Sequence, residues 1–174
     1  MKVRSRLVTF TAVISALTVV LSVVSMPFMF GTRIHFFQVG ILLAGISAGP
    51  LSGLIAGGIG GLYVASLRGD PTILVGNGLL GLFAGIFARK FRPVVAGMAA
   101  WTLIQAPWIY LTGTYLFHVP SFTMQAILML LTAENFVCAC VVDVLNSHFH
   151  LRDLFAFGQT SPQAPRLSAH ESPF

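Results

Sequence analysis

The chain has 174 residues, of which 56% are hydrophobic and only 9% are charged. This composition lies outside the range of soluble domains and excludes an ordinary water-soluble fold. The formal net charge of +5 comes from cations that are spread along the chain, a distribution that does not favour nucleic-acid binding.

The apolar length between Leu7 and Asn146 predicts about six membrane-spanning helices, because one crossing needs roughly 20 mostly apolar residues. The runs show no sustained two-residue alternation, which favours helices over a barrel. The predicted spans are residues 7–30, 36–48, 51–67, 73–88, 94–111 and 122–146. Since further apolar runs follow the first, we expect it to be a retained helix and not a signal peptide.

These spans predict an all-α integral membrane protein, a six-transmembrane-helix bundle over residues 1–147. The stretch 148–174 loses the apolar pattern and becomes rich in Pro and Ser, which indicates a disordered tail.

Lys and Arg in short loops predict the orientation. If the N-terminus is cytoplasmic, the outer loops contain only Arg33 and Arg68. The cytoplasmic side then contains the other Lys and Arg residues of these regions. Those are Lys2, Arg4, Arg6, Arg89, Lys90, Arg92 and Arg152. We therefore expect both termini to be cytoplasmic.

Glycines recur every four residues through the second and third spans and again in the fourth. They are Gly45, Gly49, Gly53, Gly57 and Gly61, followed by Gly81 and Gly85. Small residues at this spacing let membrane helices approach closely, so we expect them to pack inside the bundle.

Polar residues inside membrane spans are expensive, and each is a functional hypothesis. Glu134 and Asn135 lie in the sixth span, where they either contact a ligand or form structural hydrogen bonds. In the fifth span Gln105 lies between Trp101 and Trp108 at helical spacing, which suits a flat ligand with a polar edge or an interfacial aromatic belt.

The same two interpretations, ligand contact and helix packing, apply to Asn77 near the outer end of the fourth span. A further set of polar residues lies on or beside the predicted outer loops, where each is either solvated or in contact with a ligand. They are Arg33, His35, Asp70, Tyr115 and His118.

The sequence contains no pattern that indicates an enzyme. It has no phosphate-binding glycine loop, no pair of His at metal-ligand spacing with a carboxylate, and no serine in a nucleophile turn. We therefore expect no catalytic residues, no metal and no cofactor.

Three segments together resemble the substrate-binding S components of energy-coupling factor (ECF) transporters, the vitamin-uptake systems of prokaryotes. They are the first-helix motif AVISA at 12–16, the core ILLAGISAGPLSGLIAG at 41–57 and GLLGLFAG at 78–85. Asp70 and Pro71 lie in the polar loop between the last two segments. The resemblance covers about residues 5–147.

This resemblance implies a six-helix binder of a water-soluble vitamin or vitamin precursor in the prokaryotic cell membrane. Its site would open outward between the outer loops and the outer halves of the last three helices. The small residues Ala12 and Ala16 would dock on a transmembrane coupling subunit, and two ATPase subunits would drive uptake as the S component topples in the membrane.

The sequence does not identify the vitamin. Glu134 would favour a cationic or donor-rich ligand and the indoles a planar ring, as in a thiamine-like or pyrimidine-type compound, whereas Arg33 would suit a carboxylate such as that of biotin.

The alternative function is a membrane scaffold, such as the six-helix protein of the rod-shape complex. A scaffold predicts that Asn77, Gln105 and Glu134 point into separate helix interfaces, and a binder predicts that they converge.

Overall fold

The computed structural model describes residues 2–27 and 33–151. Helix α1 (Lys2–Val23) is followed by a short antiparallel hairpin of β1 (Ser25–Pro27) and β2 (Arg33–His35), in which Met26 pairs with Ile34. The predicted first span of 7–30 therefore differs from the observed helix at both ends. Pro27 disfavours helical geometry in the residue before it, which is consistent with a helix that ends before this point.

The next three helices are α2 (Phe37–Ala48), α3 (Pro50–Arg68) and α4 (Thr72–Phe87). Gly49, with φ of 101°, makes the turn between α2 and α3, and Pro50 occupies the first turn of α3, where its missing N–H costs nothing. Gly69, with φ of 64°, ends α3 in the left-handed conformation that glycine adopts readily.

The fifth span is one long helical rod, Pro93–Leu116, with two π-helical turns inside it. The rod consists of α5 (Pro93–Ala100), η2 (Trp101–Gln105), α6 (Ala106–Leu111) and η3 (Thr112–Leu116). Pro107 follows η2 and has no N–H for the preceding turn, a local disruption that a wider turn accommodates. The rod therefore extends beyond the predicted span of 94–111.

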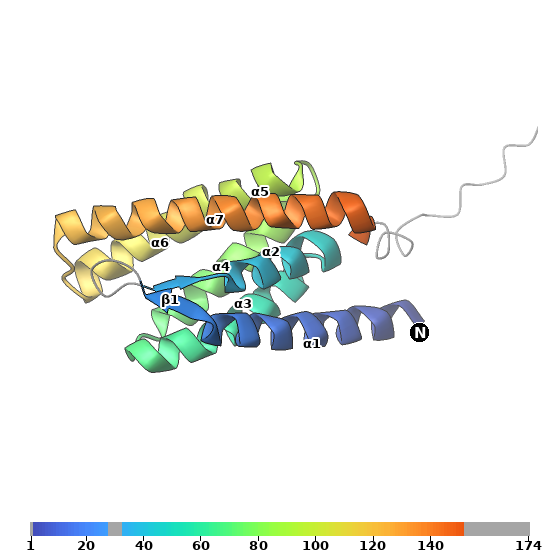
Figure 1. Ribbon diagram of the computed structural model, residues 1–174, viewed down its shortest axis with the longest axis horizontal. Coiled ribbons are helices and arrows are strands. Elements are labelled where there is room, and N and C mark those ends of the chain that lie inside the picture. Colours follow the sequence, from blue (N-terminus) through green and yellow to red (C-terminus); the bar gives the residue numbers. More distant parts are fainter. Residues whose placement is uncertain (1, 28–32, 152–174) are drawn as a thin grey trace, which may run out of the picture.

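The last helix, α7 (Ser121–Phe149), runs along most of the length of the molecule (Figure 1). Four of the described helical rods are long and apolar enough to cross a membrane, and α2 and α4 are shorter apolar helices of 12 and 16 residues. These six rods confirm the predicted all-α bundle. The N-terminus and the end of α7 lie at one end of the molecule and the β-hairpin lies at the other (Figure 1).

Helix α2 forms the centre of the bundle, between α1 on one side and α7 on the other (Figure 1). It is buried almost all round, and Ile41 and Leu42 are completely inaccessible. Because the outer helices expose many large apolar residues, such as Val8 and Met129, the outer surface suits lipid.

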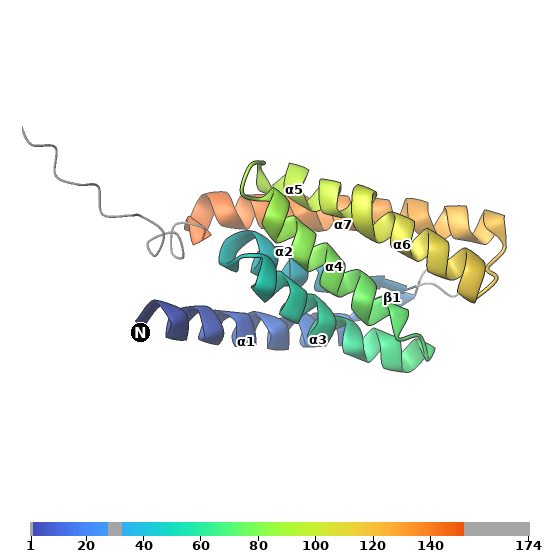
Figure 2. The same cartoon turned by 180° about the vertical axis from the view of Figure 1, so that it is seen from behind.

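The glycine pattern packs α3 against α4, which cross in front of α2 in the reverse view (Figure 2). A Cβ added at Gly53 would overlap the backbone oxygen of Gly81, and one added at Gly57 would overlap that of Asn77. The predicted role in internal packing is confirmed for all of these glycines except Gly49, which has no atom within 4 Å of an added Cβ and instead makes the turn between α2 and α3.

Candidate functional site

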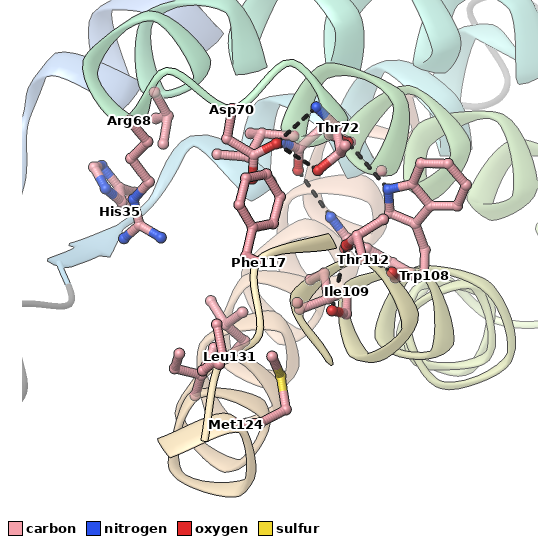
Figure 3. Close-up of a pocket in the computed structure, with 18 of the residues that line it drawn as sticks. His35, Arg68, Asp70, Thr72, Trp108, Ile109, Thr112, Phe117, Met124 and Leu131 are labelled. Carbon is pink, nitrogen blue, oxygen red and sulfur yellow. Dashed lines mark hydrogen bonds between the residues drawn. The ribbon is translucent and has the colours of Figure 1, made fainter. Parts of the chain in front are cut away.

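A cavity of about 450 Å³ lies at the hairpin end of the bundle. Its volume falls within the range of roughly 300–1,000 Å³ that is typical of small-molecule sites. The lining comes from β2, α2, α3 and its loop, α4, the rod Pro93–Leu116 with the loop after it, and α7 (Figure 3). The polar lining residues are His35, Gln38, Arg68, Asp70, Thr72, Asn77, Gln105 and Thr112.

Two buried amides from different helices meet in the wall of this cavity. Gln105 Nε2 donates a hydrogen bond of 2.9 Å to Asn77 Oδ1, and each side chain is only 4% exposed. Gln105 Oε1 is buried and has no hydrogen-bond partner among the described residues. The pair therefore leaves one buried acceptor beside the cavity without a hydrogen bond among the described residues, which is costly away from water.

Both tryptophans of the chain line the cavity, and both indole N–H groups are already used by the protein. Trp101 Nε1 donates to Thr132 Oγ1 at 2.9 Å, and Trp108 Nε1 donates to the backbone oxygen of Thr72 at 3.0 Å. Gly76 leaves the space for Trp108, because a Cβ there would lie 2.9 Å from Trp108 Cδ1. The fixed indoles offer apolar ring surface to a ligand.

Asp70 has a structural role in the lining of the cavity. Its Oδ1 accepts hydrogen bonds from the Thr72 backbone N–H at 2.9 Å and from Thr72 Oγ1 at 2.6 Å. These bonds satisfy a free donor at the start of α4 (Figure 3). Arg68, at the end of α3, lines the same region and is exposed.

Glu134 lies outside the cavity lining, in a buried contact with the hairpin. Its Oε1 accepts a 3.3 Å hydrogen bond from the backbone N–H of His35, and the side chain of Gln38 lies beside the carboxyl group. His35 Nδ1 lies 3.1 Å from the backbone oxygen of Ser22 near the end of α1. These contacts join α7, the hairpin and α1 next to the cavity wall that His35 and Gln38 form.

The structure brings together five of the ten predicted ligand contacts, which are His35, Asp70, Asn77, Gln105 and Trp108. Tyr115, His118, Glu134 and Asn135 are not among the described lining residues. Tyr115 and His118 are exposed at the end of the rod, and Asn135 is buried and donates to the backbone oxygen of Leu131. Arg33 has its backbone in β2, and its side chain lies outside the described part of the structure.

Several lining residues were not predicted from the sequence. Gln38 is a polar residue in a short apolar span, so the reasoning that selected Asn77 applied to it as well. The apolar members carry no such signal, because every membrane helix contains residues of their kind. They are Phe37, Val64, Ile73, Ile109, Phe117, Val119, Met124, Ile127 and Leu131.

The chain is similar to known transporter subunits in both sequence and fold. A family model described as ECF-type riboflavin transporter, S component, matches residues 2–148. A solved structure described as "Structure and mechanism of the S component of a bacterial ECF transporter" is similar to this fold, with a TM-score of 0.55 and 21% sequence identity. The similarity covers 90% of this chain and 99% of that one.

No curated protein matched the sequence. The family match extends over nearly all of the helical bundle, and the structural similarity supports the same fold. The members of the family are substrate-binding subunits of transporters and not enzymes. The chain therefore belongs to the family of ECF-type riboflavin transporter S components.

Proposed function

We propose that this protein is the membrane-embedded subunit that binds riboflavin with high affinity for uptake. The observation that carries the proposal is the convergence of Asn77 and Gln105 in a cavity that both indoles also line. If the protein were a scaffold, these two amides would be expected in separate helix–helix interfaces. Because Glu134 is not in the lining, the proposal rests on the amide pair and not on all three residues that were expected to converge.

The chemistry of riboflavin fits this lining. Its ring system is flat and largely apolar, with N–H and C=O groups on one edge, and its side chain is a polyol. The indoles and aliphatic side chains suit the ring surface, and the amide pair of Asn77 and Gln105 suits the polar edge of the ring. A thiamine-like cation has weaker support, because the buried carboxyl group of Glu134 lies outside the lining.

We propose that a transmembrane coupling subunit and two ATPase subunits complete the transporter, as the family description supports. Ala12 and Ala16 are exposed on α1, on a helix whose other side packs against α2 and α3. Small residues at four-residue spacing let another membrane helix approach closely. This exposure supports docking of the coupling subunit on α1.

We also propose that both termini are cytoplasmic and that the cavity end faces outward. The start of α1 and the end of α7 lie at the same end of the molecule, and the hairpin, whose His35 lines the cavity, lies at the opposite end (Figure 1). This arrangement agrees with the orientation that the Lys and Arg distribution predicts.

The test is calorimetric titration of riboflavin into the protein purified in detergent. We expect saturable binding and, at a ligand concentration of 100 times Kd, a stabilisation of about 2.7 kcal/mol. Thiamine and biotin serve as controls. If riboflavin does not bind and either control does, the proposed substrate is wrong, although the family assignment remains.

A further inference from the structure

Trp108 lines the cavity from the fifth rod and packs against the beginning of α4. Its Nε1 donates a hydrogen bond of 3.0 Å to the backbone oxygen of Thr72 (Figure 3). One turn further along α4, a Cβ added at Gly76 would lie 2.9 Å from Trp108 Cδ1. Because Thr72 and Gly76 are four residues apart, they lie on one face of α4. The indole is therefore held by a backbone acceptor and by a close approach to this face.

The acceptor for the indole belongs to the first residue of α4, where the helix constrains its own backbone least. The first N–H groups of a helix have no partner within it, and helix ends fray when nothing replaces those bonds. Pro71, which precedes the helix, makes no side-chain capping bond. The position of the Thr72 carbonyl group therefore depends on what else holds the start of α4.

Asp70 holds the start of α4 through both its side chain and its backbone. Its Oδ1 accepts the Thr72 backbone N–H at 2.9 Å and the Thr72 hydroxyl at 2.6 Å (Figure 3). Its backbone oxygen accepts a further hydrogen bond of 3.4 Å from the backbone N–H of Ile73. Thr72 is thus bonded to Asp70 on one side and to Trp108 on the other.

We propose that Asp70 is a positioning residue for Trp108, and that it acts on ligand binding through Thr72 and not by touching the ligand. A flat ring binds more tightly to an aromatic side chain that is fixed before binding, because less conformational freedom is then lost. The inference rests on the proposed function, because it takes riboflavin as the ligand.

The experiment is a double-mutant cycle of Asp70→Ala and Trp108→Phe, in which calorimetric titration measures the Kd of riboflavin. Phenylalanine keeps an aromatic ring but has no N–H to donate to Thr72. We expect Asp70→Ala to weaken binding about fivefold in the wild-type background and less than about twofold in the Trp108→Phe background. Equal losses in the two backgrounds would overturn the inference, because Asp70 would then act without the indole hydrogen bond.

Two further variants separate the hydrogen bonds of Asp70 from its charge and from the loss of a carboxylate in general. Asp70→Asn keeps an acceptor oxygen for Thr72, so its Kd should stay within about twofold of wild type. Asp143→Ala makes the same replacement on α7, at a residue that is not among the described lining residues, and should also bind like wild type. A loss with either variant as large as that with Asp70→Ala would overturn the inference.

Tryptophan fluorescence of the ligand-free protein tests the positioning step by itself. The chain has 2 tryptophans, so a Trp101→Phe background leaves Trp108 as the reporter. In that background Asp70→Ala should increase the quenching of Trp108 emission by acrylamide, because the indole is less firmly held. Asp70→Asn should leave the quenching unchanged. Equal quenching with Asp70→Ala and with the parent protein would overturn the inference.

Failure of the proposed function has a different result. In that case the wild-type protein does not bind riboflavin, and the inference fails with it. If the wild type binds riboflavin and the two losses in the cycle are additive, the proposed function stands and the positioning role of Asp70 is wrong.

Discussion

Gln105 and Asn77 are joined across the cavity wall by a 2.9 Å hydrogen bond from Gln105 Nε2 to Asn77 Oδ1. The two residues come from η2 and α4, and both are buried. The bond links the fifth span to the fourth, and it leaves Gln105 Oε1 as a buried acceptor without a partner among the described residues. The pair can therefore be tested both for ligand binding and for stability.

Replacing Gln105 by Met should weaken riboflavin binding by about 5- to 150-fold, the range for loss of one buried hydrogen-bond partner. Asn77→Ala should have a smaller effect on binding, because Asn77 acts mainly by holding Gln105. Calorimetric titration measures both, and Gln125→Met, at an exposed position of α7, serves as the control. Equal affinities for wild type and Gln105→Met would contradict a ligand contact at Gln105.

Tryptophan emission should report directly on the cavity. The chain has 2 tryptophans and both line the cavity, so a flavin bound against them should quench most of the emission. Trp101→Phe and Trp108→Phe should each retain a quenched signal from the remaining indole. Emission that is unaffected at saturating riboflavin would place the ligand elsewhere.

Trp108→Phe should also destabilise the fold by about 0.5–1.5 kcal/mol, because the hydrogen bond to the Thr72 oxygen is lost. Thermal unfolding of the ligand-free protein measures this effect. Because a phenyl ring is smaller than an indole, the measured loss includes reduced packing as well as the lost bond.

The glycines of α3 offer a matched pair for a packing test. Gly53→Ala should destabilise the protein by about 1–3 kcal/mol, because its Cβ would overlap the backbone of Gly81. Gly58→Ala on the same helix meets nothing within 4 Å and should be neutral or slightly stabilising. Thermal unfolding in one detergent compares the two, and similar losses in both would contradict the close α3–α4 packing.

Bulky residues on α1 should separate assembly from ligand binding. Ala12→Leu combined with Ala16→Leu should abolish co-purification with the coupling subunit and vitamin uptake, and riboflavin affinity should remain within about twofold of wild type. Ala133→Leu, an exposed position of α7, is the control. Assembly that survives the double replacement would show that the docking surface lies elsewhere.

Orientation can be measured by cysteine labelling in a Cys140→Ser background, where Cys138 is buried. His118→Cys should react with a membrane-impermeant maleimide on whole cells. Arg89→Cys should react only after the cells are opened. Both positions are exposed in the structure, so the reverse pattern would invert the proposed topology.

The sequence by itself determined that the protein lies in a lipid membrane, that it is helical and that its glycines pack helices together. Composition, the length of the apolar segments and the four-residue glycine spacing can all be read without knowing which segments meet. It also determined which polar residues were candidates for ligand contact. A polar residue such as Gln105 can be recognised without a structure when it lies in an apolar segment long enough to cross a membrane. The ends of α1 and of the fifth rod were less predictable, because the hairpin and the π-helical turns depend on how neighbouring segments pack.

Only the tertiary structure decided which candidates share a cavity. Asn77 and Gln105 meet because α4 packs against η2, and Glu134 faces α2 and the hairpin because of the rotation of α7 about its axis. Gln38 enters the cavity wall because the central helix α2 is covered on nearly all sides. Contacts between spans depend on helix rotation and crossing, which the spacing of residues within one span does not specify.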